Sequence, residues 1–118
     1  MNKLLTLIPA ALIVAVAAWA ASYVPNAAGT DATLTISSGV IQGNTITLDD
    51  ATTHVWWSIA DAGAWVTFDG SDPAVDTGHF IADGSSGVWS RYMFNNARFI
   101  REDATDAAFR ISEVQEVK

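Results

Sequence analysis

The side chains best suited to chemistry are two histidines and a run of aspartates. His54 and His79 form no His-x-His or His-Glu-x-x-His pair, and a zinc site needs three or four ligands. The run 69–76 contains three aspartates, but it places Gly70 second and Phe80 twelfth. An EF-hand loop instead needs glycine at position six and glutamate at position twelve. We therefore expect a turn in which Asp side chains cap backbone N–H groups.

A nucleophile is equally hard to assign. Ser58 and Ser90 lie within aromatic, apolar runs, and neither has a Gly-x-Ser-x-Gly elbow around it. Cysteine is absent, which excludes disulfides, thiolate zinc ligands and cysteine nucleophiles. Thirteen acidic residues always offer carboxylate pairs, so such pairs do not by themselves indicate glycoside hydrolysis. The sequence predicts a protein that is not an enzyme and has no catalytic, cofactor or metal site.

The charge of the chain limits its partners. In 118 residues there are six Lys and Arg against thirteen Asp and Glu, a net charge of −7. Lys3 is the only charged residue before Asp31, so the rest of the chain carries 5 − 13 = −8. Binding to phosphate groups requires clustered cations, so we expect no nucleic-acid partner. The length corresponds to one domain.

Tryptophans and arginines are the remaining candidates for binding. Trp56 and Trp57 are adjacent, so on a strand they point to opposite faces, and the outward one is a candidate contact residue. We expect Trp65 and Trp89 to pack in the core. The arginines after residue 90 either bridge neighbouring copies of the chain or pair with carboxylates inside the domain. The candidate interface residues are Trp56, Trp57, Arg91, Arg98 and Arg101.

The body of the chain is predicted to be all-β. From residue 34 onward, short aromatic and β-branched runs alternate with turn residues at spacings near ten, and no apolar repeat of helical period is sustained. About eight short strands at this spacing favour an antiparallel β-sandwich over residues 34–118, jelly-roll-like in topology. The expected strands cover residues 34–37, 40–41, 46–48, 54–59, 64–68, 78–81, 88–94, 97–101 and 107–114.

Residues 1–24 form a hydrophobic segment that we expect to be a helix. Residues 4–21 contain no charge, and as a helix they would span about 27 Å, the thickness of a bilayer core. Trp19 and Tyr23 would then lie at the membrane interface. A secretory signal peptide, or an arm buried in a protein assembly, fits the same segment. Residues 25–33 are small and polar and are predicted to be a linker.

One stretch resembles a known group of proteins. Its pieces are Phe68–Ala74 (FDGSDPA), Gly78–Ile81 (GHFI), Gly87–Ser90 (GVWS), Phe99–Arg101 (FIR) and Ala104–Ala107 (ATDA). This pattern of turns and strands is similar to that of small bacteriophage virion proteins, and the resemblance covers roughly residues 54–114. Such proteins are β-sandwich subunits without enzymatic activity that decorate, cement or join parts of the particle. An apolar N-terminus is a departure from that group.

The resemblance implies a virion structural protein, a minor capsid, vertex or decoration subunit. Its expected partners are coat or other virion proteins and further copies of itself, with a lipid membrane as a possible partner of residues 4–24. The alternative is a secreted or surface-anchored β-sandwich module, located outside the cell or in its envelope, that has a signal peptide and binds carbohydrate or protein.

Overall fold

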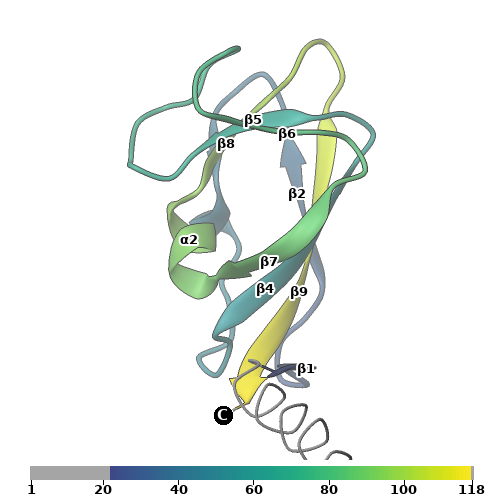
Figure 1. Cartoon of the computed structure of the whole chain (residues 1–118), viewed down its shortest axis with the longest axis vertical. Coiled ribbons are helices and arrows are strands. Elements are labelled where there is room, and N and C mark those ends of the chain that lie inside the picture. Colours follow the sequence, from purple (N-terminus) through teal and green to yellow (C-terminus); the bar gives the residue numbers. More distant parts are fainter. Residues whose placement is uncertain (1–21, 118) are drawn as a thin grey trace, which may run out of the picture.

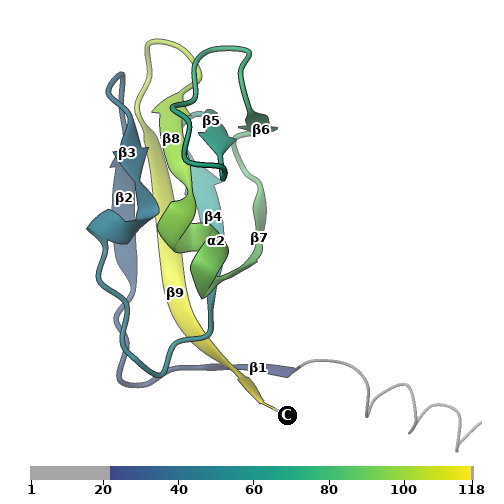
Figure 2. The same ribbon diagram turned by 90° about the vertical axis from the view of Figure 1, so that its left-hand side faces the viewer.

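The computed structural model describes residues 22–117, which form two antiparallel sheets packed face to face (Figures 1 and 2). The strands are β1 (Ser22–Pro25), β2 (Ala32–Ile36), β3 (Ile41–Gln42), β4 (His54–Ala60), β5 (Ala64–Thr67), β6 (His79–Ile81), β7 (Ser86–Ser90), β8 (Arg98–Arg101) and β9 (Ala107–Val117). Two short helices, η1 (Gly43–Thr45) and α2 (Arg91–Asn96), lie between strands. The prediction of an antiparallel, two-sheet β protein is confirmed.

The five-stranded sheet is organised around β9, the longest strand. One side of β9 pairs with β4, which in turn pairs with β7. The other side pairs with β2 along residues 107–111 and with β1 along residues 114–117. The second sheet has the order β3-β8-β5-β6. The connections therefore cross repeatedly between the two layers.

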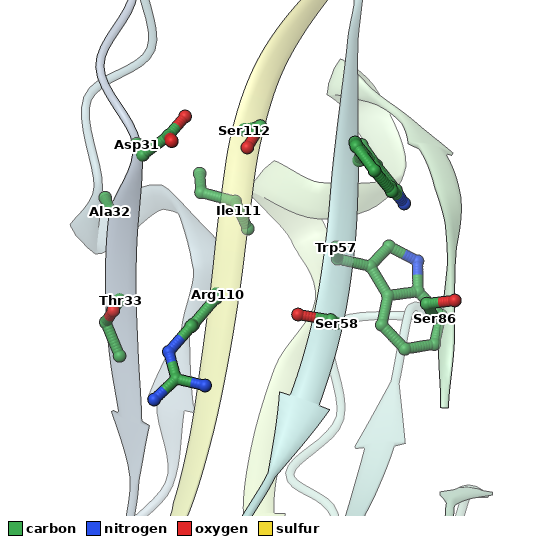
Figure 3. Close-up of a pocket in the computed structure, with 10 residues that line it drawn as sticks. Asp31, Ala32, Thr33, Trp57, Ser58, Ser86, Arg110, Ile111 and Ser112 are labelled. Carbon is green, nitrogen blue, oxygen red and sulfur yellow. The ribbon is translucent and has the colours of Figure 1, made fainter. Parts of the chain in front are cut away.

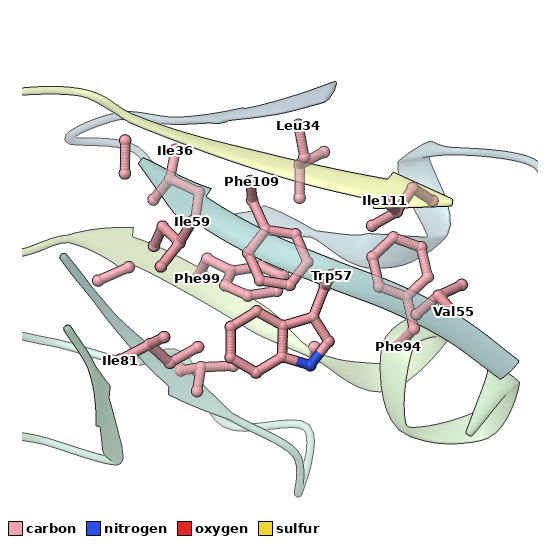
Figure 4. Close-up of a cluster of buried hydrophobic side chains, with 14 of the residues drawn as sticks. Leu34, Ile36, Val55, Trp57, Ile59, Ile81, Phe94, Phe99, Phe109 and Ile111 are labelled. Atoms are coloured by element: carbon pink, nitrogen blue, oxygen red, sulfur yellow. The ribbon is translucent and has the colours of Figure 1, made fainter. Parts of the chain in front are cut away.

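Aromatic side chains fill the space between the sheets (Figure 4). The ring of Phe109 has its centroid 5.3 Å from that of Trp57 and 4.8 Å from that of Phe99. Trp57 is buried, whereas Trp56 is 58% exposed on the opposite face of β4. The expectation that the two tryptophans point to opposite faces is thus confirmed. Gly87 on β7 lies against the Trp57 ring, where a Cβ atom would come within 3.1 Å of the indole.

Two of the predicted strands are wrong. The strand expected over residues 88–94 ends at Ser90, and α2 follows it. The Ser90 hydroxyl accepts a hydrogen bond from the backbone N–H of Met93 at 3.1 Å, which caps the helix and ends the strand. This turn places Phe94 in the core, fully buried. Residues 46–48 form no strand either, although Leu48 is buried beneath the loop that they begin.

Residues 22–33 belong to the sandwich, in contrast to the linker predicted for residues 25–33. β1 pairs with the end of β9, Ser22 opposite Val117. Asn26 is buried, and its side-chain amide donates hydrogen bonds to Asp49 Oδ2 and Thr52 Oγ1, both at 2.9 Å. The small polar residues of this stretch supply hydrogen bonds to the fold, which is why a linker-like composition here forms ordered structure.

A buried carboxylate joins this N-terminal stretch to the rest of the fold. Glu113 on β9 is only 5% exposed. Its Oε2 accepts a hydrogen bond from the backbone N–H of Thr30 at 2.8 Å. Its Oε1 accepts one from the backbone N–H of Asp49 at 2.6 Å and one from the Thr52 hydroxyl at 2.7 Å. Gly29 packs so closely that a Cβ atom there would lie 2.6 Å from the Glu113 Cδ.

Asp49 extends the same cluster. The hydrogen bond from the Asn26 side chain, followed by one from the backbone N–H of Ala51, holds the pKa of the Asp49 carboxyl below its ordinary value. The carboxyl of Asp49, hydrogen-bonded to Asn26, thus favours its charged form. Three segments that are distant in sequence, the stretch 26–30, the loop 48–53 and β9, therefore share one polar cluster.

The helix predicted for residues 1–24 falls almost wholly outside the described residues. Its last residues, 22–24, lie in strand β1. Within residues 22–117 there is no helix with the length and apolar character needed to cross a bilayer. Figures 1 and 2 show β1 beside the C-terminal end of β9, so the chain enters and leaves the sandwich at the same end.

The two adjacent tryptophans give a matched test of the packing. We expect Trp57→Ala to lower the free energy of unfolding by about 3–5 kcal/mol, because it empties a site filled by a buried indole. Trp56→Ala should change it by no more than about 1 kcal/mol, since that ring is largely exposed. Urea unfolding of the full chain in mild detergent, followed by circular dichroism, measures both. Equal losses would contradict the assigned faces of β4.

The role of Glu113 is tested against a second glutamate on the same strand. We expect Glu113→Ala to cost about 3 kcal/mol or more, because it leaves two backbone N–H groups and a hydroxyl without their acceptor. Glu116→Ala is the control, and we expect a change within about 0.5 kcal/mol. Urea unfolding, as for the tryptophan variants, measures the loss of stability in Glu113→Ala and in Glu116→Ala. A Glu113→Ala variant as stable as the control would show that the carboxylate does not hold the N-terminal stretch.

Candidate functional site

The outer face of the five-stranded sheet presents an ordered array of side chains. In one row, Thr33 on β2 lies opposite Arg110 on β9, which lies opposite Ser58 on β4 and then Ser86 on β7. The row is fixed by strand pairing, so these four side chains project side by side from four different strands.

A second row runs parallel to the first. Ser112 on β9 lies opposite Trp56 on β4, which lies opposite Val88 on β7. Asp31 immediately precedes β2 and continues this row beyond Ser112. Figure 3 shows Asp31 and Ser112 at one level of the sheet and Thr33, Arg110 and Ser58 at the next. Side chains from both rows therefore face the same space.

These rows enclose a shallow groove of about 380 Å³. Polar side chains from β2, β9, β4 and β7 line it, together with the apolar residues Ala32, Trp56, Trp57 and Ile111. The lining residues that matter here are Asp31, Thr33, Trp56, Ser58, Arg110 and Ser112. The groove has a rigid floor, because β9 and β4 are the two central strands of the sheet and are paired along residues 54–60 of β4.

Trp56 is the principal apolar side chain of this face. It is more than half exposed, and its neighbour across the strand, Val88, is 44% exposed. Among the described residues, no aromatic ring pair includes Trp56; the pairs join the other tryptophans, the phenylalanines, Tyr23 and the histidines. Its ring therefore has a face open to solvent at the side of the groove.

Arg110 is the cation of this face. Its side chain is exposed, and within residues 22–117 no carboxylate lies within salt-bridge distance of it. The other arginines have partners. Arg98 pairs with Asp72 and Arg101 with Asp106, each at 2.7 Å. Arg110 thus differs from them in presenting all its donors to the groove and to solvent.

Arg91 is occupied inside the fold. Its Nη1 donates hydrogen bonds to the carbonyl oxygens of Asp49 at 2.6 Å and Thr52 at 3.1 Å. It lies at the start of α2 and holds the loop 48–53 against the sandwich. Arg98 and Arg101 pair with carboxylates of the same domain, which is one of the two alternatives that the sequence left open. Arg91 binds backbone carbonyls instead.

Of the five interface residues predicted from sequence, only Trp56 projects freely from the domain. Trp57 is in the core, which corrects its place as an interface candidate, and the three arginines bind groups of their own chain. Of the two residues predicted for a membrane interface, Trp19 lies outside the described residues. Tyr23 lies on β1, with its ring centroid 4.8 Å from that of His54.

The residues considered for metal binding lie in separate parts of the fold: His54 on β4, His79 on β6 and the aspartate run 69–76 in the loop between β5 and β6. Within residues 22–117 no group of three or more His, Asp or Glu side chains is placed to hold a metal ion. The aspartate run begins with a turn in which Asp69 Oδ1 accepts hydrogen bonds from the backbone N–H and the hydroxyl of Ser71. The hydroxyl and then the backbone N–H of Ser71 hold the pKa of Asp69 below its ordinary value.

No protein-family model matches the chain, and the searches of curated proteins and of solved structures find no match either. The groove was not predictable from the sequence as a site. Arg110, Ser58 and Thr33 are far apart in the chain, and only the strand order brings them together. The one signal present in the sequence was the pair of adjacent tryptophans, which required one of them to face outward.

Arg91, which binds groups of its own chain, and Arg110, which faces the groove, should contribute differently to the stability of the fold. We expect Arg91→Ala to lower the free energy of unfolding by about 1.5–3 kcal/mol, because it removes charge-assisted hydrogen bonds to the carbonyls of the loop 48–53. Arg110→Ala should stay within about 0.5 kcal/mol. Thermal and urea unfolding of the full-length variants test this difference. A large loss for Arg110→Ala would reveal a structural role for that side chain.

Proposed function

We propose that the chain is a structural subunit of a virus particle, without enzymatic activity: a minor capsid, vertex or decoration protein that assembles with coat proteins and with further copies of itself. The chain is then located in the virion, and it is attached to a membrane if residues 4–24 insert in lipid. Three features of the chain support this proposal: the strand order, the position of the turn motifs and the end at which the chain enters the sandwich.

The strand order is the observation that carries the proposal. Counted from β2 as the first strand, one sheet has the order first, eighth, third, sixth and the other the order second, seventh, fourth, fifth. Two Greek keys wound into a jelly roll produce this order, and the jelly roll is an architecture of viral capsid and lectin domains. One fold hosts several functions, so the turn motifs are needed as a second support.

The motifs that resemble phage virion proteins fall on turns and strands of this jelly roll. Residues 68–74 lie in the loop between β5 and β6, residues 99–101 lie in β8, and residues 104–107 form the turn into β9. The resemblance therefore concerns the framework rather than a reactive site, as expected for a protein whose role is assembly.

The end of the sandwich that contains β1 is suited to attachment. Tyr23, Val24 and Val117 lie there with 43%, 40% and 49% of their surfaces exposed. Val24 and Val117 project from one face of the β1–β9 pair, because Ser22, two residues before Val24, is the partner of Val117. Tyr23 projects from the other face of the same pair. An apolar end of this kind fits a contact with coat subunits or with a lipid layer, in continuation of the hydrophobic residues 4–24.

Fractionation from the natural source tests the proposal. We expect the chain to sediment with large particles in a density gradient and to require detergent, not carbonate, for its release. Mapping of the N-terminal peptide on the same material shows whether residues 4–24 are retained. If the chain sediments with particles but needs no detergent for its release, it is still a virion protein, and residues 4–24 are then an arm buried in protein.

The second candidate is a secreted or surface-anchored module, favoured by the exposed groove beside Trp56. It predicts a chain that begins near Ala21, a monomeric acidic domain in solution and no association with particles. That combination would overturn the virion proposal.

A further inference from the structure

We infer that the groove on the five-stranded sheet is a carbohydrate-binding site, in which a pyranose ring stacks on Trp56 and its hydroxyls bond to Arg110, Asp31 and the hydroxyl side chains between them. The inference stands on the groove itself and holds for a virion subunit and for a secreted module alike.

The aromatic ring is the first element of the site. Trp56 projects from a central strand with more than half of its surface exposed, next to Val88. A pyranose has a face of C–H groups that packs on such a ring, while its hydroxyls point outward at the rim. We expect Trp56→Ala to cost the fold little, because the ring is largely exposed.

The polar groups of the groove match what sugar hydroxyls need. A sugar hydroxyl both donates and accepts, and the hydroxyls of Thr33, Ser58 and Ser112 do the same. Arg110 adds several donors in a fixed plane, and Asp31, at the level of Ser112 in the neighbouring row, adds acceptors. A small number of convergent polar groups beside an apolar surface is the usual composition of a small-molecule site.

The size and rigidity of the groove fit the same ligand. Its volume of about 380 Å³ lies at the lower end of the range for small-molecule sites and admits one or two sugar rings. Its lining side chains stand on paired strands, so their spacing is set before the ligand arrives. A preorganised site of this kind spends less binding free energy on ordering side chains.

A protein partner fits this face less well. The centre of a protein–protein interface is depleted of charge and rich in apolar side chains. Here only Trp56 and Val88 are apolar among the eight side chains of the two rows, and a charge of each sign, Asp31 and Arg110, lies among them. The composition therefore favours a small, hydroxyl-rich ligand over a coat subunit at this face.

The test is saturation-transfer NMR on the full chain in detergent micelles with a panel of methyl pyranosides and short oligosaccharides, neutral and carboxylate-bearing. We expect at least one member to receive saturation from the protein. Trp56→Ala should weaken its binding by about tenfold or more, and Trp56→Tyr should retain it, since a tyrosine ring still offers a flat face.

Arg110→Ala and a control variant complete the design. Arg110→Ala should weaken binding severalfold without loss of stability. Tyr92→Ala removes an aromatic ring that is 76% exposed on α2, away from the groove, and should leave binding unchanged. Circular dichroism of each variant confirms that it is folded.

Two results would overturn the inference. One is the absence of saturation transfer to every sugar of the panel with the wild-type chain. The other is binding that Trp56→Ala leaves intact, which would place the sugar elsewhere. If no sugar binds while Trp56→Ala prevents incorporation into particles, the face is a protein contact instead.

Discussion

The fold depends on a buried carboxylate that binds three separate parts of the chain. Glu113 accepts hydrogen bonds from the stretch 26–30 and from the loop 48–53 while it stands on the central strand β9. A carboxylate this buried is stable only if its oxygens are satisfied, so these segments are required to be where they are. β1 is held against the end of β9 by its own strand pairing, Ser22 opposite Val117, which fixes the end at which the N-terminal residues join the sandwich.

We propose two distinct functional regions for the molecule. The end that carries β1 has exposed apolar side chains and continues toward the hydrophobic residues 4–24, so it is the proposed point of attachment. The outer face of the five-stranded sheet presents Trp56 and Val88 beside polar side chains and contains the groove. Attachment by one end leaves that face available for a ligand, and a subunit present in many copies would bind a multivalent glycan with high avidity.

The sequence predicted the layers better than the site. Alternating side chains identified the strands and required Trp56 and Trp57 to face opposite ways, because that period is local. Helix α2 escaped prediction because six residues do not complete a recognisable helical repeat. The stretch 25–33 looked like a linker because its partner, Glu113, lies more than eighty positions away. The groove depends on the strand order, which local patterns do not contain.

The most direct measurement is hydroxyl-radical footprinting of intact particles, with oxidation of each aromatic residue read by mass spectrometry. Trp57, buried in the core, is the internal control that should stay unmodified. We expect Tyr23 to be protected in the particle, because the β1 end is the proposed point of attachment, and Trp56 to be oxidised freely. Protection of Trp56 in the absence of sugar, with Tyr23 oxidised, would contradict it: the sheet face would then be the attachment surface and the β1 end would be free.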